Sequence, residues 1–168
     1  MVRKLAIGLV LLLGGLCLAI VAGVRYNGTR SLPEGFYLVI HRRLQKGDLV
    51  FVKLPQAPVY DMARRRGYLD VGWSPARHLL KRLVAVGGDR ATINALGVEV
   101  NGITLANSVP LTKDAAGLPL QFYPLRNYTL GPDEILIMSE SPASFDSRYF
   151  GPVKRTMLES VVVPLLTW

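Results

Sequence analysis

The sequence predicts a mainly β protein: a single N-terminal transmembrane helix over residues 1–25, followed by an antiparallel β domain over residues 26–168 with one short helical or loop insertion at about 57–77. Two observations carry this prediction. Leu5–Val24 is a run of twenty residues without a charge, and the rest of the chain is a series of short apolar segments divided by Gly, Pro and Asp turns. The composition, 50% hydrophobic and 19% charged, excludes a disordered chain, and 168 residues are too few for a multidomain enzyme.

The apolar run is long enough to cross a membrane once, because twenty helical residues span about 30 Å, the thickness of the hydrocarbon layer. A cleaved signal peptide is the alternative, since Arg3 and Lys4 form a basic start, but its apolar core is typically about 7–15 residues long. We therefore favour a retained anchor, and clipping stays open. Basic residues on both flanks of the run leave its orientation open as well.

The elements of the domain follow from segments rich in Val, Ile, Leu, Phe and Tyr, which are typical of strands. In chain order, the segments expected to form strands are 35–42, 48–54, 78–86, 91–105 and 134–140. Within the fourth segment, Asn101-Gly102 between apolar neighbours predicts a tight hairpin turn. A short helix is predicted at Val59–Gly67, inside the insertion.

The net charge of +8 raises the question of a nucleic-acid partner. The basic residues are scattered, however, and no aromatic residues alternate with them as in proteins that bind single strands. No nucleic acid is therefore expected as a partner. A basic domain beside an anchor is better interpreted as lying on the anionic headgroups of the lipid bilayer.

Thiol and metal chemistry are not expected in the domain. The only cysteine, Cys17, lies within the apolar run, so the domain has no thiol nucleophile. His41 and His78 do not make a convincing zinc cluster, and the sequence holds no metal-ligand spacing and no glycine-rich phosphate loop. We expect neither a metal nor a cofactor.

Lys81 is the candidate general base, because histidine is too scarce to assume a Ser-His-Asp triad. It lies beside Arg82 in an apolar segment, and strand alternation alone does not choose between the two cations. Chemistry does, since arginine does not deprotonate in proteins, whereas burial lowers the pKa of a lysine toward neutrality. The ordinary alternative is a lysine at a sheet edge that reaches solvent.

Ser31 is the candidate nucleophile, seven residues beyond Val24 at the end of the apolar run. A helix capping box formed with Glu34 is the alternative, but the strand expected after Gly35 argues against a helix there. Taken singly, neither Ser31 nor Lys81 identifies an enzyme.

Four blocks, taken together and in order, resemble the type I signal peptidase family of Ser/Lys membrane proteases. They are the nucleophile segment 31–35 behind the anchor, the segment 46–51 with Pro55, the segment 81–89 and the closing segment 144–153. Ser-Leu-Pro-x-Gly at 31–35, and Arg66–Leu69 leading through a Pro-containing loop to Lys81, resemble the TraF-type conjugative transfer peptidases. The chain departs from the family at Met138–Pro142, where the usual Gly-Asp-Asn is missing.

The resemblance implies an antiparallel β catalytic domain of the signal peptidase type and a role for each matched residue. Ser31 would attack the peptide carbonyl, and neutral Lys81 would take the Ser31 proton. The Ser31 backbone N–H and the Thr29 hydroxyl would form the oxyanion hole. Ser144 would orient the Lys81 amine, whereas Asp146 and Arg148 would be a structural pair that braces the loop.

The resemblance also implies a function: a membrane-anchored serine endopeptidase that matures a membrane-embedded prepilin or other transfer protein. The resemblance implies that the site lies at the outer, periplasmic face of the bacterial inner membrane. Seven residues reach at most about 25 Å from the anchor, so the site should lie at or near the membrane surface. Hydrolysis and cyclisation of the substrate both stay open. One alternative is a housekeeping signal peptidase that removes leaders from secretory preproteins, and another is a non-catalytic scaffold tethered to the membrane.

Overall fold

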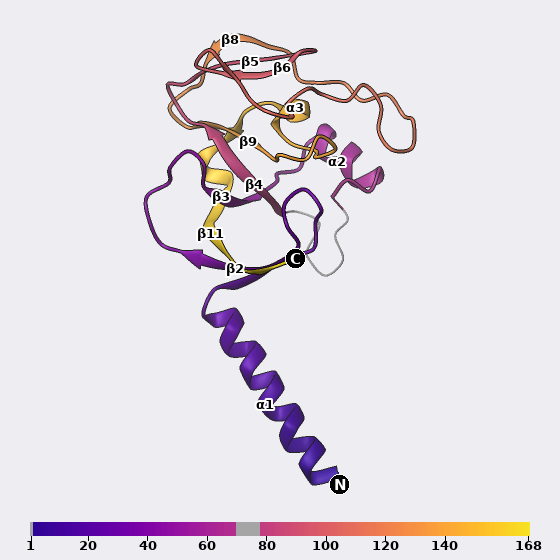
Figure 1. Ribbon diagram of the computed structural model, residues 1–168, viewed down its shortest axis with the longest axis vertical. Coiled ribbons are helices and arrows are strands. Elements are labelled where there is room, and N and C mark those ends of the chain that lie inside the picture. The colour runs from indigo at the N-terminus through magenta and orange to yellow at the C-terminus, as the bar shows by residue number, and fades with distance from the viewer. Residues whose placement is uncertain (1, 70–77) are drawn as a thin grey trace.

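The computed structural model describes residues 2–69 and 78–168 of the chain (Figure 1). Its helices are α1 (Val2–Val21), α2 (Pro58–Arg65), α3 (Ser147–Phe150) and the short 3-10 helix η1 (Arg155–Met157). The strands are β1 (Val24–Asn27), β2 (Gly35–Ile40), β3 (Leu49–Lys53), β4 (His78–Ala85), β5 (Arg90–Asn94), β6 (Gly97–Val100), β7 (Ile103–Thr104), β8 (Leu125–Thr129), β9 (Glu134–Met138), β10 (Val153–Lys154) and β11 (Leu158–Thr167).

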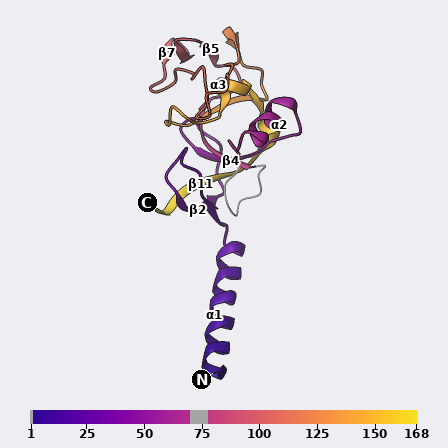
Figure 2. The same ribbon diagram turned by 90° about the vertical axis from the view of Figure 1, so that its right-hand side faces the viewer.

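The strands form two antiparallel sheets. The larger sheet has seven strands in the order β1-β2-β11-β3-β4-β9-β10, and the smaller has four in the order β7-β6-β5-β8. In both views α1 projects away from the strands, and the smaller sheet lies at the opposite end of the molecule (Figures 1 and 2). The prediction of a mainly β, antiparallel protein with few helices is confirmed.

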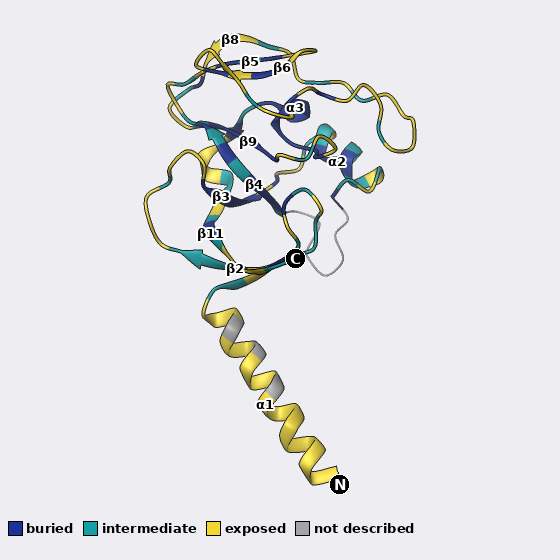
Figure 3. Cartoon of the chain, in the orientation of Figure 1, coloured by how far each residue is buried: buried dark blue, intermediate teal, exposed yellow. Residues whose placement is uncertain are grey.

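The core consists of three clusters of buried apolar side chains, which Figure 3 shows within the strands, in contrast to the exposed α1. The largest cluster lies between the large sheet and the short helices and holds Tyr60 of α2 and Tyr149 of α3. A second joins the small sheet to β4 and β9. The third buries Leu32, the residue after Ser31, against Tyr37, Phe51, Leu80 and Val162. Burial of a leucine side chain contributes about 1.5–3 kcal/mol, so this contact holds the loop of Ser31 on the sheet.

The N-terminal helix ends earlier than the apolar run. Gly23 has a φ of +90°, a left-handed conformation that ends a helix, and the backbone then enters β1 at Val24. The Val39 amide donates to the Gly23 carbonyl at 3.0 Å, which fixes this corner on β2. Across the described residues, no helix meets the length and apolarity of a membrane span, so the predicted transmembrane helix is not confirmed.

Most of the expected elements occur close to their predicted ranges. β2, β3, β4 and β9 lie inside predicted strands, and the segment 91–105 divides into β5, β6 and β7. The turn between β6 and β7 has φ values of 52° at Asn101 and 82° at Gly102, as the Asn-Gly signal predicted. α2 begins at Pro58, whose missing N–H suits the first turn of a helix. Of the insertion 57–77, residues 70–77 lie outside the described residues.

The sequence prediction did not include β1, β8, β10, β11 or α3. β8 is mostly exposed and polar, so it lacks the apolar alternation of a half-buried strand. β11 contains Pro164, which usually excludes a central strand, and the pairing of β11 with β2 shifts register between Pro164 and Leu166. β3 pairs with β11 only over residues 158–162, so Pro164 lies in a part of β11 that pairs with β2 alone.

Candidate active site

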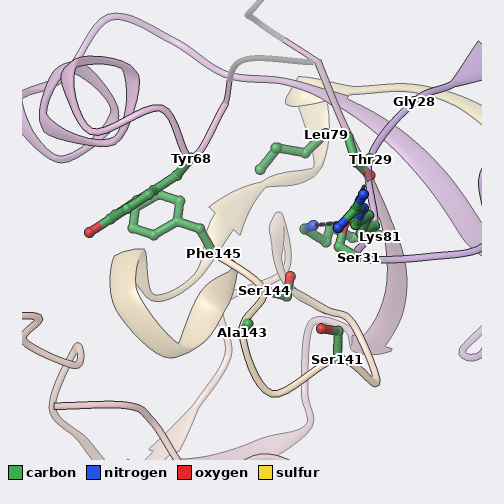
Figure 4. A pocket seen from close by; sticks show the side chains of 11 residues that line it. Gly28, Thr29, Ser31, Tyr68, Leu79, Lys81, Ser141, Ala143, Ser144 and Phe145 are labelled. Atoms are coloured by element: carbon green, nitrogen blue, oxygen red, sulfur yellow. Dashed lines mark hydrogen bonds between the residues drawn. The ribbon is translucent and has the colours of Figure 1, made fainter. Parts of the chain in front are cut away.

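Ser31 lies in the loop between β1 and β2, and Lys81 lies in the middle of β4. Asn27 and Gly35 pair at the base of the hairpin, so residues 28–34 form its loop. The Lys81 Nζ donates a hydrogen bond to the Ser31 Oγ at 2.7 Å, across fifty positions of sequence (Figure 4). Gly35 is required where the loop returns to the sheet, because a Cβ there would lie 2.2 Å from the Leu166 carbonyl oxygen.

Lys81 is buried, with 3% of its surface exposed. Burial lowers its pKa from 10.5 to about 8; the nearby Asp146 opposes this shift, and Arg148 adds to it. The adjacent Arg82 faces the other way and forms an ion pair with Glu140 at 2.9 Å. The strand thus buries the cation that can lose its proton and leaves the one that cannot half-buried in an ion pair on the other side.

Two further side chains continue the hydrogen bonds from Ser31. The Thr29 Oγ1 lies 3.0 Å from the Ser31 Oγ and 2.8 Å from the Oδ1 of Asn27. The Thr29 hydroxyl therefore lies beside that of Ser31, and its expected role in an oxyanion hole stays a prediction. Asn27 was not among the predicted site residues, because an asparagine at the end of a strand is ordinary turn chemistry.

Asp146 and Arg148 form a fully buried ion pair, with 2.7 Å between Arg148 Nη2 and Asp146 Oδ2. The guanidinium also donates to four backbone carbonyl groups. These belong to Ser141 at 2.8 Å, Asn107 and Pro142 at 3.1 Å, and Ser144 at 3.2 Å. The pair thus holds the backbone of the segment that faces Lys81.

Ser139 links this segment to the loop of Ser31. Its hydroxyl donates to the Ser31 carbonyl oxygen, and its backbone N–H donates to Asp146 Oδ2 at 3.1 Å. Sequence reasoning missed Ser139, since its contact is with a residue 108 positions away and no local pattern marks it.

Ser144 lines the same cavity as Lys81 but is not joined to it. Its hydroxyl is buried and has no hydrogen-bond partner among the described residues. In Figure 4 it points into the cavity. The structure therefore brings Ser31, Lys81 and Thr29 into contact and leaves Ser144 nearby without a bond.

The cavity beside Ser31 and Lys81 has a volume of about 350 Å³. Thr29 and Ser31 line one side, whereas Tyr68, Leu79 and Phe145 give the other side an apolar surface (Figure 4). A lysine amine whose pKa is near 8, in hydrogen-bond contact with a serine hydroxyl, can take the hydroxyl proton and activate the oxygen as a nucleophile. Among the described residues, no group of three or more His, Cys, Asp or Glu side chains could hold a metal ion.

Comparison with known proteins gives a family match over residues 2–166, described as signal peptidase, peptidase S26. A plasmid transfer protein TraF from Escherichia coli is 42% identical over 164 residues, covering 96% of this chain and 92% of that protein. A conjugal transfer protein TraF from Agrobacterium fabrum is 31% identical over 171 residues, covering 99% and 96%. These matches confirm the resemblance that the four sequence blocks predicted.

A crystal structure of a signal peptidase I from Enterococcus faecalis V583 covers 73% of this chain and 98% of its own, with 19% identity and a TM-score of 0.42. That score is too low for the likeness to support a conclusion about the site.

Proposed function

Because the chain belongs to the signal peptidase family, peptidase S26, we propose that it is a serine endopeptidase that works with a Ser31–Lys81 dyad. The observation that carries the proposal is the 2.7 Å hydrogen bond from the Lys81 Nζ to the Ser31 Oγ. The burial of Lys81 supports the assignment of the base, since a base must be neutral to accept a proton and burial brings its pKa to about 8.

In the proposed reaction, the Ser31 Oγ attacks the carbonyl carbon of the cleaved peptide bond while neutral Lys81 takes the hydroxyl proton. The oxyanion of the tetrahedral intermediate accepts hydrogen bonds from the Ser31 backbone N–H and the Thr29 hydroxyl. The Lys81 ammonium then gives its proton to the leaving amine as the C–N bond breaks, and an acyl-enzyme remains. Water or an amine of the substrate attacks this ester, which yields a free carboxyl group or a cyclic peptide.

We propose a membrane-embedded prepilin or other transfer protein as the substrate. Support comes from the relatives, which are named plasmid transfer protein and conjugal transfer protein. The cavity agrees with small side chains next to the cleaved bond, since Tyr68, Leu79 and Phe145 limit its apolar side. A housekeeping signal peptidase acting on secretory preproteins is the competing assignment.

We further propose that α1 holds the enzyme at the outer face of the bacterial inner membrane, as a single pass. The support is that large apolar side chains are exposed along α1, from Val2 at 80% to Val21 at 84%. Close to the junction of α1 and β1, the exposed rings of Tyr26, Phe36 and Trp168 form a cluster with centroids 5.5–6.4 Å apart. Aromatic side chains of this kind favour the membrane–water interface.

The test uses the full chain in detergent with two substrates, a prepilin encoded beside it and a secretory preprotein, and follows product mass. We expect the wild-type protein to process the prepilin. Ser31→Ala and Lys81→Met should each lower the rate by at least about 10³-fold, because each removes a reacting group. Arg82→Met is the matched control, since it removes the adjacent cation, which points away from Ser31.

Each outcome decides one part of the proposal. Processing by Lys81→Met at the rate of Arg82→Met would contradict the dyad. Equal processing of both substrates would contradict a transfer peptidase, and no processing of either would favour a scaffold. A product lighter by one water than the hydrolysed peptide would identify cyclisation.

A further inference from the structure

Asn27 ends β1 at the base of the hairpin that carries Ser31, and only 3% of its surface is exposed. Its Nδ2 lies 3.1 Å from the carbonyl oxygen of Thr29, 3.3 Å from that of Leu32 and 3.0 Å from that of Pro33. Its Oδ1 lies 3.1 Å from the Thr29 amide nitrogen and 2.8 Å from the Thr29 hydroxyl. These five hydrogen bonds all join the carboxamide to residues of the loop 28–34.

These neighbours determine which end of the carboxamide is nitrogen. The three groups on one side are carbonyls, which only accept hydrogen bonds, and the backbone amide on the other side only donates. Exchanging nitrogen and oxygen would place acceptor against acceptor and donor against donor. The Oδ1 of Asn27 therefore faces Thr29.

The direction of the remaining hydrogen bonds follows from counting hydrogens. A hydroxyl group has one hydrogen, and the Oδ1 of Asn27 has none to give, so the Thr29 hydroxyl donates to Asn27. The Thr29 oxygen can then only accept from Ser31, 3.0 Å away. The Ser31 hydrogen consequently points toward Thr29, and the Ser31 oxygen presents a lone pair to the Lys81 amine.

We propose that Asn27 is a positioning residue that acts through Thr29: by accepting the only hydroxyl hydrogen of Thr29, it directs the hydrogen of Ser31 away from Lys81 before substrate binds. The proposal deepens the proposed Ser31–Lys81 dyad and rests on it. When substrate binds, the Thr29 hydroxyl turns from Asn27 to the oxyanion, and the Ser31 hydrogen is free to turn to Lys81. Asn27 thus holds the nucleophile unreactive until the oxyanion donor is needed.

The directions of these hydrogen bonds affect the pKa of Lys81, which the shape of the loop alone would not do. A Ser31 oxygen that only accepts from Lys81 stabilises the ammonium form. Removing the Asn27 acceptor frees the Thr29 hydrogen to point at Ser31, and Ser31 can then donate to the neutral amine. A neutral hydrogen bond contributes about 0.5–1.5 kcal/mol, so Asn27→Ala should lower the Lys81 pKa by about half a unit to one unit.

The experiment titrates Lys81 by ¹³C NMR in the full chain in detergent, for the wild type, Asn27→Ala, Thr29→Val and the double variant. We expect Asn27→Ala to lower the titration midpoint in the wild-type background and to leave it unchanged in the Thr29→Val background. Asp146 and Arg148, the charged groups that act on Lys81, are kept in all four proteins. Equal shifts in both backgrounds, or a shift in neither, would overturn the proposal.

Circular dichroism and thermal unfolding report whether each variant is folded. If Asn27→Ala is not, Asn27→Leu takes its place, because leucine branches at the same atom as asparagine and carries no acceptor. The titration requires no turnover, so a wild-type protein that processes no peptide would refute the proposed function without affecting this measurement. Normal processing combined with equal shifts of the Lys81 midpoint in both backgrounds, or with a shift in neither, would refute only the role of Asn27.

Discussion

Two segments enclose Lys81, and each is held by one buried side chain whose N–H groups bind several backbone carbonyls. In the loop 28–34 that side chain is Asn27, which bonds to three carbonyls. In the segment 139–148 it is Arg148, which bonds to three carbonyls of the segment, to the carbonyl of Asn107 and to Asp146. Both segments are therefore held by hydrogen bonds from one buried side chain to several carbonyls. The side chains differ in charge, because the carboxamide of Asn27 is neutral and the guanidinium of Arg148 is positive.

This difference in charge gives the two side chains different effects on the site. A buried guanidinium needs its carboxylate partner, and loss of either leaves the other charge without compensation. A neutral carboxamide is less costly to remove, but Asn27 contacts the hydroxyl that neighbours the nucleophile. We infer that the segment of Arg148 provides a fixed wall, whereas the loop of Asn27 determines the direction of the reacting hydrogens.

The largest expected effect is on stability, and it concerns the segment 139–148 held by Arg148. Arg148→Met should lower the free energy of unfolding by about 3–5 kcal/mol, because it leaves Asp146 as a buried, unpaired charge. Asn27→Ala should lower it by about 1–3 kcal/mol, the cost of leaving buried groups unsatisfied. Urea unfolding measures both, with the exposed Arg126→Met as a control for loss of a cation. Equal losses for the two variants would remove the distinction between the segments.

The second prediction concerns Lys81, which lies between the two segments. Its folded pKa of about 8 is below the ordinary 10.5, so between these pH values the unfolded chain binds more protons than the folded one. The free energy of unfolding should consequently rise with pH through this window, by about 3 kcal/mol from Lys81 alone. The rise should be absent in Lys81→Met, which should also be more stable than the wild type at pH 7.

Urea unfolding of both proteins at intervals from pH 7 to pH 11 measures the difference, in which the other titrating groups cancel. Parallel curves for Lys81→Met and the wild type would mean that the pKa of Lys81 is the same in the folded and the unfolded chain, and therefore that Lys81 is charged and a poor base near neutral pH. The rate of peptide processing should rise to a plateau with its midpoint near pH 8, because only the neutral amine accepts a proton. The free energy of unfolding should rise at higher pH, between the folded and the unfolded pKa.

The sequence singled out Lys81 as the candidate base because chemistry distinguishes lysine from arginine where strand alternation does not. The structure places the Lys81 amine 2.7 Å from the Ser31 hydroxyl, and the roles of the two groups stay a proposal. Most of the strands were predictable for a similar reason, since their apolar segments are bounded by turn residues. Asn27 and Ser139 were not predictable, because their roles depend on hydrogen bonds whose geometry no spacing encodes. The early end of α1 depends on a left-handed Gly23 packed on Val39, a contact between segments that the sequence pattern does not connect.

The smallest expected effect concerns Ser144, on the wall side of the cavity. Since its buried hydroxyl has no partner among the described residues, Ser144→Ala should change the free energy of unfolding by less than about 1 kcal/mol. If the resemblance assigns its role correctly, kcat should nevertheless fall about tenfold with KM unchanged, because the hydroxyl orients the Lys81 amine only when substrate is bound. An unchanged kcat would mean that the Ser144 hydroxyl does not orient the Lys81 amine, so that only the loop of Asn27 would hold positioning residues.

The place of β11 in the large sheet determines when the site can exist. β11 lies between β2, which continues from the hairpin of Ser31, and β3, which pairs with the strand of Lys81. The hairpin of Ser31 and the strand of Lys81 therefore share no sheet until residues 158–167 lie between them. Since this strand follows both residues in chain order, a ribosome-bound chain that still lacks residues 158–167 also lacks the sheet that brings Ser31 and Lys81 together.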